Sequence, residues 1–402
     1  MKLKFKRAVI NRDKCVDCGF CTDVFQCPSP DRCIGCLACI DACPYTAREV
    51  IEIEEDVKYI RIYVDNAEYR VPDGITILNA LSSLGYYVDA PCKLGGCWSC
   101  IVLADGEPVR SCITPVRDGI KISLDIENVT PLRIMHGPEG HLVGGKGTPW
   151  WEVDYRRYIE AAIWVAGCNL RCPQCQNFHV TYDNSSKPVT PYEAARLVTK
   201  CRIMYNANAV AISGGEPTLN RRWLIEYFKE LTKLNPDARR HLDSNGTLLT
   251  RDYIDELVEA GCNNIGVEPK TYSLDTYMRV TGLKDRELAS RYHETSWNAI
   301  RYIVDNYLDK VYLGVGLIYN KALVSLDEIY KAGLKIASID PDIQVTVLDY
   351  FPAFRRRDII RPSPYEMLKV KKTLEDAGLK TVIVQTSLGH IGPGDRNIRL
   401  IQ

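Results

Sequence analysis

The residues with the most specific chemistry are three cysteines, Cys168, Cys172 and Cys175, spaced C-x3-C-x2-C. A four-iron cluster that only carries electrons takes four protein ligands. A run of three thiolates therefore leaves one iron open to a ligand that is not a cysteine of this run. A zinc knuckle is the competing interpretation, but no fourth Cys or His follows at zinc-ribbon spacing.

Polar and glycine-rich segments follow several apolar stretches further along the chain. Ser213–Thr218 reads Ser-Gly-Gly-Glu-Pro-Thr, in which two glycines let the backbone approach a ligand and a carboxylate follows. Asp243–Thr247, Gly266–Lys270 and Gly314–Gly316 follow later stretches. At each position a buried structural Glu or Asn is the alternative. Four such segments at successive strand ends nevertheless predict one shared site.

Together these motifs resemble the radical S-adenosylmethionine (SAM) superfamily. The resemblance implies that the open iron chelates the amino and carboxylate groups of SAM, and that one electron cleaves SAM to a 5′-deoxyadenosyl radical. It implies a catalytic role for the cluster of Cys168, Cys172 and Cys175. The cofactor contacts that it implies are Gly214, Gly215, Glu216, Pro217, Ser244, Asn245, Gln174 and Lys270. Gln174 stands where the family usually has an aromatic residue against adenine, so Gln174 or Phe178 is expected to hold adenine.

Within that superfamily the core most resembles glycyl-radical activating enzymes and relatives of the AmmeMemo type. The resembling stretches are Cys172–Asn177, Val267–Lys270 with Tyr277–Gly282, and Asp349–Pro352 with Ala377–Lys380. The chain departs at Glu268-Pro269-Lys270, where those relatives usually have Asp-Leu-Lys. Their substrate is therefore not carried over.

Residues 1–56 hold eight cysteines in two similar runs, each ending in Cys-Pro. They resemble bacterial two-cluster ferredoxins, in which the fourth Cys of each run ligates the other cluster. The resemblance implies one [4Fe–4S] cluster on Cys15, Cys18, Cys21 and Cys43, and another on Cys33, Cys36, Cys39 and Cys27. Two structural zinc sites are the alternative. The flanking segments Arg7–Ile10 and Val50–Ile53 are expected to pair as strands.

Residues 57–127 begin with a period-two strand, Val57–Val64, and a turn at Asp65-Asn66, before a short helix over Ile75–Leu84. Cys92, Cys97, Cys100 and Cys112 then have the plant-type [2Fe–2S] spacing. Gly95 and Gly96 allow the loop to wrap around the sulfides. This stretch resembles a β-grasp ferredoxin.

From residue 161 to 402 apolar strands alternate with amphipathic helices, which predicts a parallel β/α layout. Capping boxes open two helices at Thr190 and Ser363. We expect a partial (β/α)6 barrel, preceded by an α+β two-cluster domain and the β-grasp domain. The Gly- and Pro-rich residues 128–160 are expected to form a surface connector, docked by Trp150 and Trp151. The expected strands are Ala161–Ala166, Ala209–Ser213, His241–Asp243, Asn264–Val267, Val311–Ile318, Gln344–Leu348 and Thr381–Gln385.

Composition and charge narrow the possible binding partners and location of the protein. With 51 basic and 51 acidic residues, bulk charge gives no argument for nucleic acid or an anionic membrane. No apolar stretch approaches the ~18 residues of a membrane span, and the basic N-terminus lacks the apolar region of a signal peptide, so we expect a cytoplasmic protein. Cys201 and Cys262 are expected to be buried fillers. The basic run Arg355–Arg357 is either solvated or faces an anionic substrate.

The sequence therefore predicts a SAM-dependent iron–sulfur oxidoreductase with three [4Fe–4S] clusters and one [2Fe–2S] cluster. It would act on a small molecule or lipid, and exchange electrons with a low-potential donor or acceptor. One alternative is an activase that installs a glycyl radical on a partner enzyme. Another is an electron-transfer subunit with a vestigial SAM domain. Because the cysteine runs are consecutive, residues 1–127 and 128–402 are expected to fold separately.

Overall fold

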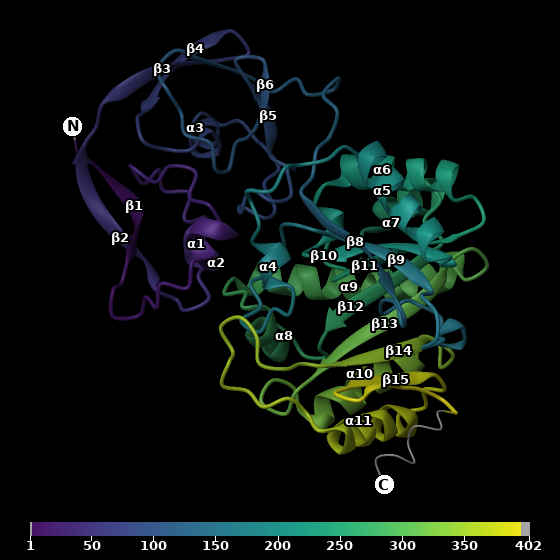
Figure 1. The fold of residues 1–402 in the computed structure, drawn as a ribbon. Coiled ribbons are helices and arrows are strands. Elements are labelled where there is room, and N and C mark those ends of the chain that lie inside the picture. Colours follow the sequence, from purple (N-terminus) through teal and green to yellow (C-terminus); the bar gives the residue numbers. More distant parts are fainter. Residues whose placement is uncertain (1, 395–402) are drawn as a thin grey trace.

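The computed structural model describes residues 2–394 of the chain. Its strands form a two-stranded, a five-stranded and a nine-stranded sheet. In Figure 1 the two smaller sheets lie next to each other, in purple and blue, on the same side of the large sheet. All three cysteine-rich regions are thereby close to one another.

The N-terminal sheet joins strand β1 (Lys2–Ile10) to β2 (Arg48–Asp56) in antiparallel register, with Arg7 opposite Ile51. The expected pairing is confirmed and extends over nine residues of each strand. The short helices α1 (Phe20–Asp23) and α2 (Ala38–Ala42) each contain the third cysteine of one run.

The second sheet has the strand order β4-β3-β7-β5-β6. Its helix α3 (Ile77–Ser83) begins where the Thr76 side chain accepts a hydrogen bond from the Asn79 amide. The strand, turn and helix expected here are confirmed. The strands are β3 (Tyr59–Val64), β4 (Ala67–Pro72), β5 (Ile101–Ala104), β6 (Glu107–Arg110) and β7 (Ile120–Ser123).

The large sheet runs in chain order from β8 to β16. Strands β9 to β15 are parallel, and β8 and β16 pair antiparallel at its two edges. Each expected strand of the core is present. The strands are β8 (Met135–His141), β9 (Glu160–Val165), β10 (Ala209–Gly214), β11 (Arg239–Ser244), β12 (Asn264–Lys270), β13 (Tyr312–Tyr319), β14 (Gln344–Asp349), β15 (Val382–Thr386) and β16 (Gly389–Ile391).

Helices connect the parallel strands, so six strand–helix units precede β15, and the mostly parallel sheet is compatible with a partial barrel. Residues of β9 and β15 line the same cavity, which requires the sheet to curve around an internal space, here called the lumen. The helices are α4 (Phe178–Thr181), α5 (Pro191–Met204), α6 (Arg221–Leu234), α7 (Arg251–Glu259), α8 (Leu274–Thr281), α9 (Arg286–Tyr307), α10 (Leu326–Ala337) and α11 (Pro364–Asp376), with 3-10 turns at Trp150–Glu152 and Pro217–Leu219.

The outer face of the sheet is buried under these helices. Trp223 and Phe228 of α6 and Ile300 of α9 are fully buried in one core that includes the strands. Each such side chain contributes ~1.5–3 kcal/mol on burial. Both expected capping boxes are present, at the first turns of α5 and α11. This shell holds the strand ends in place.

The expected surface connector is wrong in two respects. Residues 135–141 form edge strand β8, whose ladder breaks between His136 and Glu139, where glycine and proline interrupt the apolar pattern. The following segment enters the lumen, as described below. Trp150 packs against Gly392, but Trp151 is 71% exposed, so most of its side chain does not contact the domain.

Among residues 2–394 we find no helix of the length and apolar character that crossing a bilayer requires.

Candidate active site at the mouth of the barrel

The three-cysteine loop leaves the end of β9 and lines a cavity of about 390 Å³ at the carboxyl ends of the strands. Gly167 opens this loop with φ 84°, and a side chain there would collide with Cys97. Cys168, Cys172 and Cys175 all face the cavity. The structure therefore brings the three predicted ligands together.

Burial controls the ionisation of these thiols. It raises the pKa of Cys168 to about 12 and those of Cys172 and Cys175 to about 11, although the Lys270 ammonium partly offsets the shift at Cys172. Among residues 2–394 no three His, Cys, Asp or Glu side chains converge tightly enough for a single metal ion. The thiols instead surround an open space. Three thiols that ionise only beside a strong positive charge suit an iron–sulfur cluster.

Glu216 lies at the centre of the second motif and is fully buried. Its Oε1 accepts hydrogen bonds from the Thr218 amide at 3.0 Å and from the Ser244 hydroxyl at 2.8 Å. Its Oε2 accepts from the Asn245 amide at 2.7 Å. Glu216 therefore ties the end of β10 to the end of β11, and both ends line the cavity.

Gly214 and Gly215 are glycines for a steric reason. A Cβ on Gly214 would meet the backbone of Val165, and one on Gly215 would meet the carbonyl of Gly167. The sequence analysis expected these glycines to approach a ligand, whereas here they allow close packing on the end of β9 and on the start of the cysteine loop. Pro217, which follows Glu216, is buried at the first position of a 3-10 turn.

Asn245 contacts the cluster loop directly. Its Nδ2 lies 3.8 Å from the Cys168 sulfur and donates to Asn169 at 3.2 Å. Its Oδ1 accepts from the Thr247 amide and hydroxyl. Asn245 is thus placed to donate a hydrogen bond to a ligand sulfur.

Lys270 ends β12 with φ 66°, where the ladder to β13 shifts register. Its ammonium pairs with Glu268 and lies 3.4 Å from the Tyr350 hydroxyl. Burial opposes the charge on Lys270, but Glu268 raises its pKa well above the usual value. Lys270 and Glu268 both face the cavity.

Gln174 and Phe178, expected at adenine, do not line this cavity. The Gln174 amide is buried and donates to the Val280 carbonyl at 2.8 Å. The Phe178 ring stacks on Phe354 and tilts against Phe20. In this structure Gln174 fixes the cysteine loop to the end of α8, and Phe178 packs between domains.

Gly314 and Gly316 were expected at a strand end of the shared site, and a chain segment that packs against them explains why they are glycines. A Cβ on Gly314 would collide with the Lys146 carbonyl, and one on Gly316 with the Lys146 side chain. A Cβ on Gly147 would likewise meet the Gly266 amide. Residues 144–147 therefore fill one end of the lumen.

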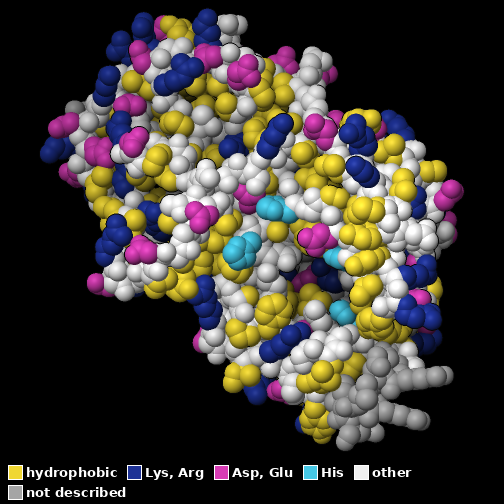
Figure 2. Space-filling view, in the orientation of Figure 1, with side chains coloured by type: hydrophobic (Ala, Val, Ile, Leu, Met, Phe, Trp, Pro, Cys, Tyr) yellow, Lys and Arg dark blue, Asp and Glu magenta, His cyan; other side chains and the backbone are white. Residues whose placement is uncertain are grey.

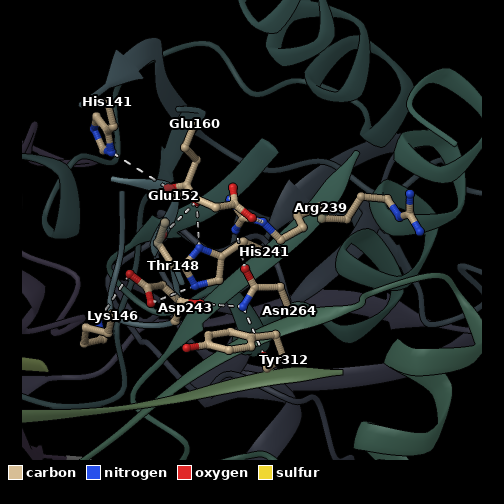
Figure 3. A network of polar contacts seen from close by, with 12 residues as sticks. His141, Lys146, Thr148, Glu152, Glu160, Arg239, His241, Asp243, Asn264 and Tyr312 are labelled. Carbon is tan, nitrogen blue, oxygen red and sulfur yellow. Dashed lines mark hydrogen bonds and ion pairs between the residues drawn. The ribbon is translucent and has the colours of Figure 1, made fainter. Parts of the chain in front are cut away.

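Lys146 was missed by the sequence analysis. It carries its ammonium into the cavity, 3.4 Å from Asp243 and 3.2 Å from Glu268. Figure 3 shows the network below it, in which His241 lies between Asp243 at 3.3 Å and Glu160 at 2.9 Å. The run Gly144-Gly145-Lys146-Gly147 was the available signal, because such glycine density suggests close packing of backbone.

The N-terminal cysteines fall into two groups. A cavity of about 350 Å³ is lined by Cys15, Cys18, Cys21 and Cys43. In the second group, burial raises the pKa values of Cys36 and Cys39, and the nearby Cys27 and Cys33 raise them further. This crossed grouping is the one that the ferredoxin resemblance implies.

The four cysteines of the β-grasp domain are buried, with exposures of 0% for Cys92 and Cys97, 1% for Cys100 and 4% for Cys112. Their thiols form two hydrogen-bonded pairs, Cys92 with Cys97 and Cys100 with Cys112. The hydrogen bond from Cys97 lowers the pKa of Cys92 to about 6. All four side chains belong to one buried core cluster.

Two arginines join the cysteine-rich regions. Arg171, next to Cys172, donates to Asp41 at 2.6 Å, to the Cys92 carbonyl at 2.6 Å and to the Cys168 carbonyl at 2.8 Å. Arg355 donates to the carbonyls of Ile40, Asp41 and Cys43. Arg355 therefore holds the two-cluster domain, and no residue of the basic run Arg355–Arg357 lines the cavity.

Comparison with protein families agrees with this geometry. Residues 163–331 match the radical SAM superfamily, residues 57–126 a 2Fe-2S iron-sulfur cluster binding domain, and residues 27–49 a 4Fe-4S binding domain. The chain therefore contains a radical SAM domain with 2Fe-2S and 4Fe-4S ferredoxin domains.

Curated relatives share part of this chain. A probable GTP 3′,8-cyclase of Methanococcus aeolicus is 34% identical over 117 residues, which are 29% of this chain and 38% of the relative. A protein of Methanocaldococcus jannaschii named as a glycyl-radical enzyme activating enzyme is 30% identical over 107 residues, 27% of this chain and 41% of the relative. The chain thus spans about two fifths of the length of these relatives.

Among solved structures, SuiB of Streptococcus suis bound to S-adenosylmethionine aligns with a TM-score of 0.40 and 15% identity, over 52% of this chain and 44% of SuiB. Coproporphyrinogen III oxidase of Escherichia coli aligns with a TM-score of 0.35 and 18% identity, over 47% and 44%.

Proposed function

We propose that this protein reductively cleaves SAM and uses the product to abstract hydrogen from a small molecule or lipid. The observation that carries the proposal is the convergence of three cysteines with Glu216, Ser244, Asn245 and Lys270 around one cavity. When bound, the cluster and SAM supply a 5′-deoxyadenosyl radical, which takes a hydrogen atom from the substrate.

The chain's own residues would position these groups. Cys168, Cys172 and Cys175 would hold three irons, and Asn245 would donate a hydrogen bond to the Cys168 sulfur. Lys270 already pairs with Glu268, so its ammonium would contact the SAM carboxylate alongside that pair. Both Glu216 oxygens already accept hydrogen bonds, so Glu216 would contact the SAM ammonium in addition to these bonds. Gly214, Gly215 and Pro217 would shape the backbone on either side of Glu216. Gln174 would then support the loop rather than adenine.

The ferredoxin domains would supply low-potential electrons, through two further [4Fe–4S] clusters and one [2Fe–2S] cluster. Arg171 supports such a relay because one guanidinium contacts all three cluster-binding regions. Direct packing of Cys97 on Gly167 would give the [2Fe–2S] domain a short route into the radical SAM loop. An electron-transfer subunit without SAM chemistry is disfavoured, since the full cysteine loop and its cavity are present.

An activase for a partner enzyme is the second candidate. It is favoured by the similarity to the Methanocaldococcus jannaschii protein. A small substrate is favoured by the lumen, which residues 144–147 partly fill. The two functions differ in product. An activase leaves a glycyl radical on another polypeptide, which electron paramagnetic resonance detects.

The proposed function is tested by adding SAM to the anaerobically reconstituted, dithionite-reduced protein. We expect methionine and 5′-deoxyadenosine to be released, slowly without substrate. Cys172→Ala should abolish this release and lower the iron content by about four per chain, because one four-iron cluster is lost. Cys201→Ala, a buried cysteine outside the clusters, is the matched control. SAM cleavage by Cys172→Ala at the native rate would refute the proposal.

A further inference from the structure

A second cavity of about 230 Å³ lies in the lumen beside the cysteine cavity. Both cavities share the lining residues Lys146, Ser213, Asp243 and Gln385, so the second cavity opens towards the site of SAM chemistry. We call it the side chamber. In Figure 2 the molecular surface is hollowed, with charged side chains visible inside and histidines around the hollow.

The floor of the side chamber belongs to the chain itself. Residues 143–146 line it, and the packing of Gly147 against Gly266 closes the lumen beyond. At 230 Å³ the chamber is somewhat smaller than the ~300–1,000 Å³ typical of ligand pockets. The part of a substrate that enters must therefore be small.

The charges around the chamber are already paired. Lys146 is the one lysine or arginine among the described residues that line it, and it lies between Asp243 and Glu268. Glu160 pairs with His241 at 2.9 Å and accepts from Thr148 at 3.1 Å. A phosphate or carboxylate would have to displace a buried carboxylate to reach a cation. Displacing it would leave a buried charge unpaired, at high cost.

Aromatic and uncharged polar side chains form the rest of the wall. Trp164 and Trp150 line the chamber, and His141 lies 5.0 Å from the Trp164 ring centroid. Gln385 and His390 face each other across strands β15 and β16 and add neutral polar groups. Burial lowers the pKa of His390 to about 4, so its ring is uncharged at pH 7.

We propose that the side chamber receives the substrate, and that the inserted part is a small, uncharged, flat ring. The ring would lie against Trp164 and exchange hydrogen bonds with Gln385 and His390. This inference rests on the proposed function, because it takes the neighbouring cavity as the site of SAM cleavage. It excludes a triphosphate in the chamber.

The test uses the reconstituted holoprotein and benzamide, a neutral ring whose amide can pair with Gln385. Saturation-transfer NMR should show benzamide binding to the native protein. Trp164→Leu should weaken that signal at least fivefold, because the stacking surface is lost, whereas Trp164→Phe should retain most of it. Trp151→Leu is the matched control, since Trp151 is exposed and does not line the chamber.

Two results would overturn the inference. One is a benzamide signal that Trp164→Leu leaves unchanged. The other is line broadening of tripolyphosphate in ³¹P spectra that disappears in Trp164→Leu, which would place an anion in the chamber. Release of 5′-deoxyadenosine from SAM is measured separately on each variant. A protein that binds benzamide through Trp164 but never cleaves SAM would refute the proposed function and leave the chamber assigned.

Discussion

The carboxylate of Glu216 is a structural acceptor as well as a candidate ligand. Its buried oxygens satisfy the Thr218 and Asn245 amides and the Ser244 hydroxyl. Glu216→Ala leaves these donors without an acceptor, and each buried unsatisfied group costs ~1–3 kcal/mol. We expect the free energy of unfolding to fall by at least about 2 kcal/mol, together with weaker SAM binding. Urea denaturation and equilibrium SAM binding measure the two effects.

The exposed Glu226 provides the control, because Glu226→Ala should change neither quantity. Native stability in Glu216→Ala would show that the carboxylate acts on the ligand alone.

His241 makes stability depend on pH. Burial opposes its charge, but Glu160 and Asp243 raise its pKa from 6.5 to about 9. Because the folded-state pKa is the higher one, the stabilisation is fully present below pH 6.5 and is lost as the pH rises through 9. We expect the melting temperature to fall between pH 7 and 10, and less steeply in His241→Gln. Calorimetry at both pH values checks this, and equal slopes in the two proteins would contradict it.

Residue spacing alone located the cluster cysteines, because ligand spacing is a local property of the chain. Lys146 could not be found in this way. Its partners Asp243 and Glu268 lie about a hundred residues further on. Gln174 was assigned by analogy to adenine, but its partner, the Val280 carbonyl, exists only once α8 packs against the loop.

At the level of elements, the loop after β14 holds the two-cluster domain in place. Arg355 donates three hydrogen bonds to the carbonyl end of α2 and to Cys43. Arg355→Ala should loosen α2, and hydrogen–deuterium exchange there should rise at least tenfold. Within residues 2–394 the Arg356 side chain pairs only with nearby Asp358, so Arg356→Ala is the matched control. Unchanged exchange in Arg355→Ala would show that other contacts suffice.

The parallel strands were predictable because each is an apolar run that alternates with an amphipathic helix, two of which open with capping boxes. Strand β8 was not, since Gly137, Pro138 and Gly140 interrupt its pattern and its partner β9 supplies the ladder. Its existence depends on pairing rather than on local preference.

Across the whole molecule, the radical SAM domain covers the [2Fe–2S] site. All four of its cysteines are nearly inaccessible, whereas Cys18 and Cys27 of the two-cluster domain are exposed. An iron chelator should therefore remove iron first from the N-terminal [4Fe–4S] clusters, while the [2Fe–2S] signal persists. Mössbauer spectra recorded during chelation follow this order. Earlier loss of the [2Fe–2S] cluster would contradict the burial argument.

The expectation of two separately folding fragments fits this structure poorly. One apolar core contains Phe20 and Cys39 from the first domain, Cys97 from the second and Tyr182 and Phe354 from the third. Cutting the chain near residue 127 would expose both sides of that core to water. The sequence showed three consecutive cysteine-rich stretches, but their shared packing is a long-range property.

The segment that fills the lumen has a consequence for protein recombination. Gly145, Lys146 and Gly147 precede the first parallel strand in the chain, yet they line the space between the strands. A chimera that joined a foreign N-terminal region at residue 161 would keep every strand and cysteine of the radical SAM domain. It would nevertheless inherit a different chamber floor. A chimera that is meant to keep the native chamber floor should therefore include the chain from β8 onwards.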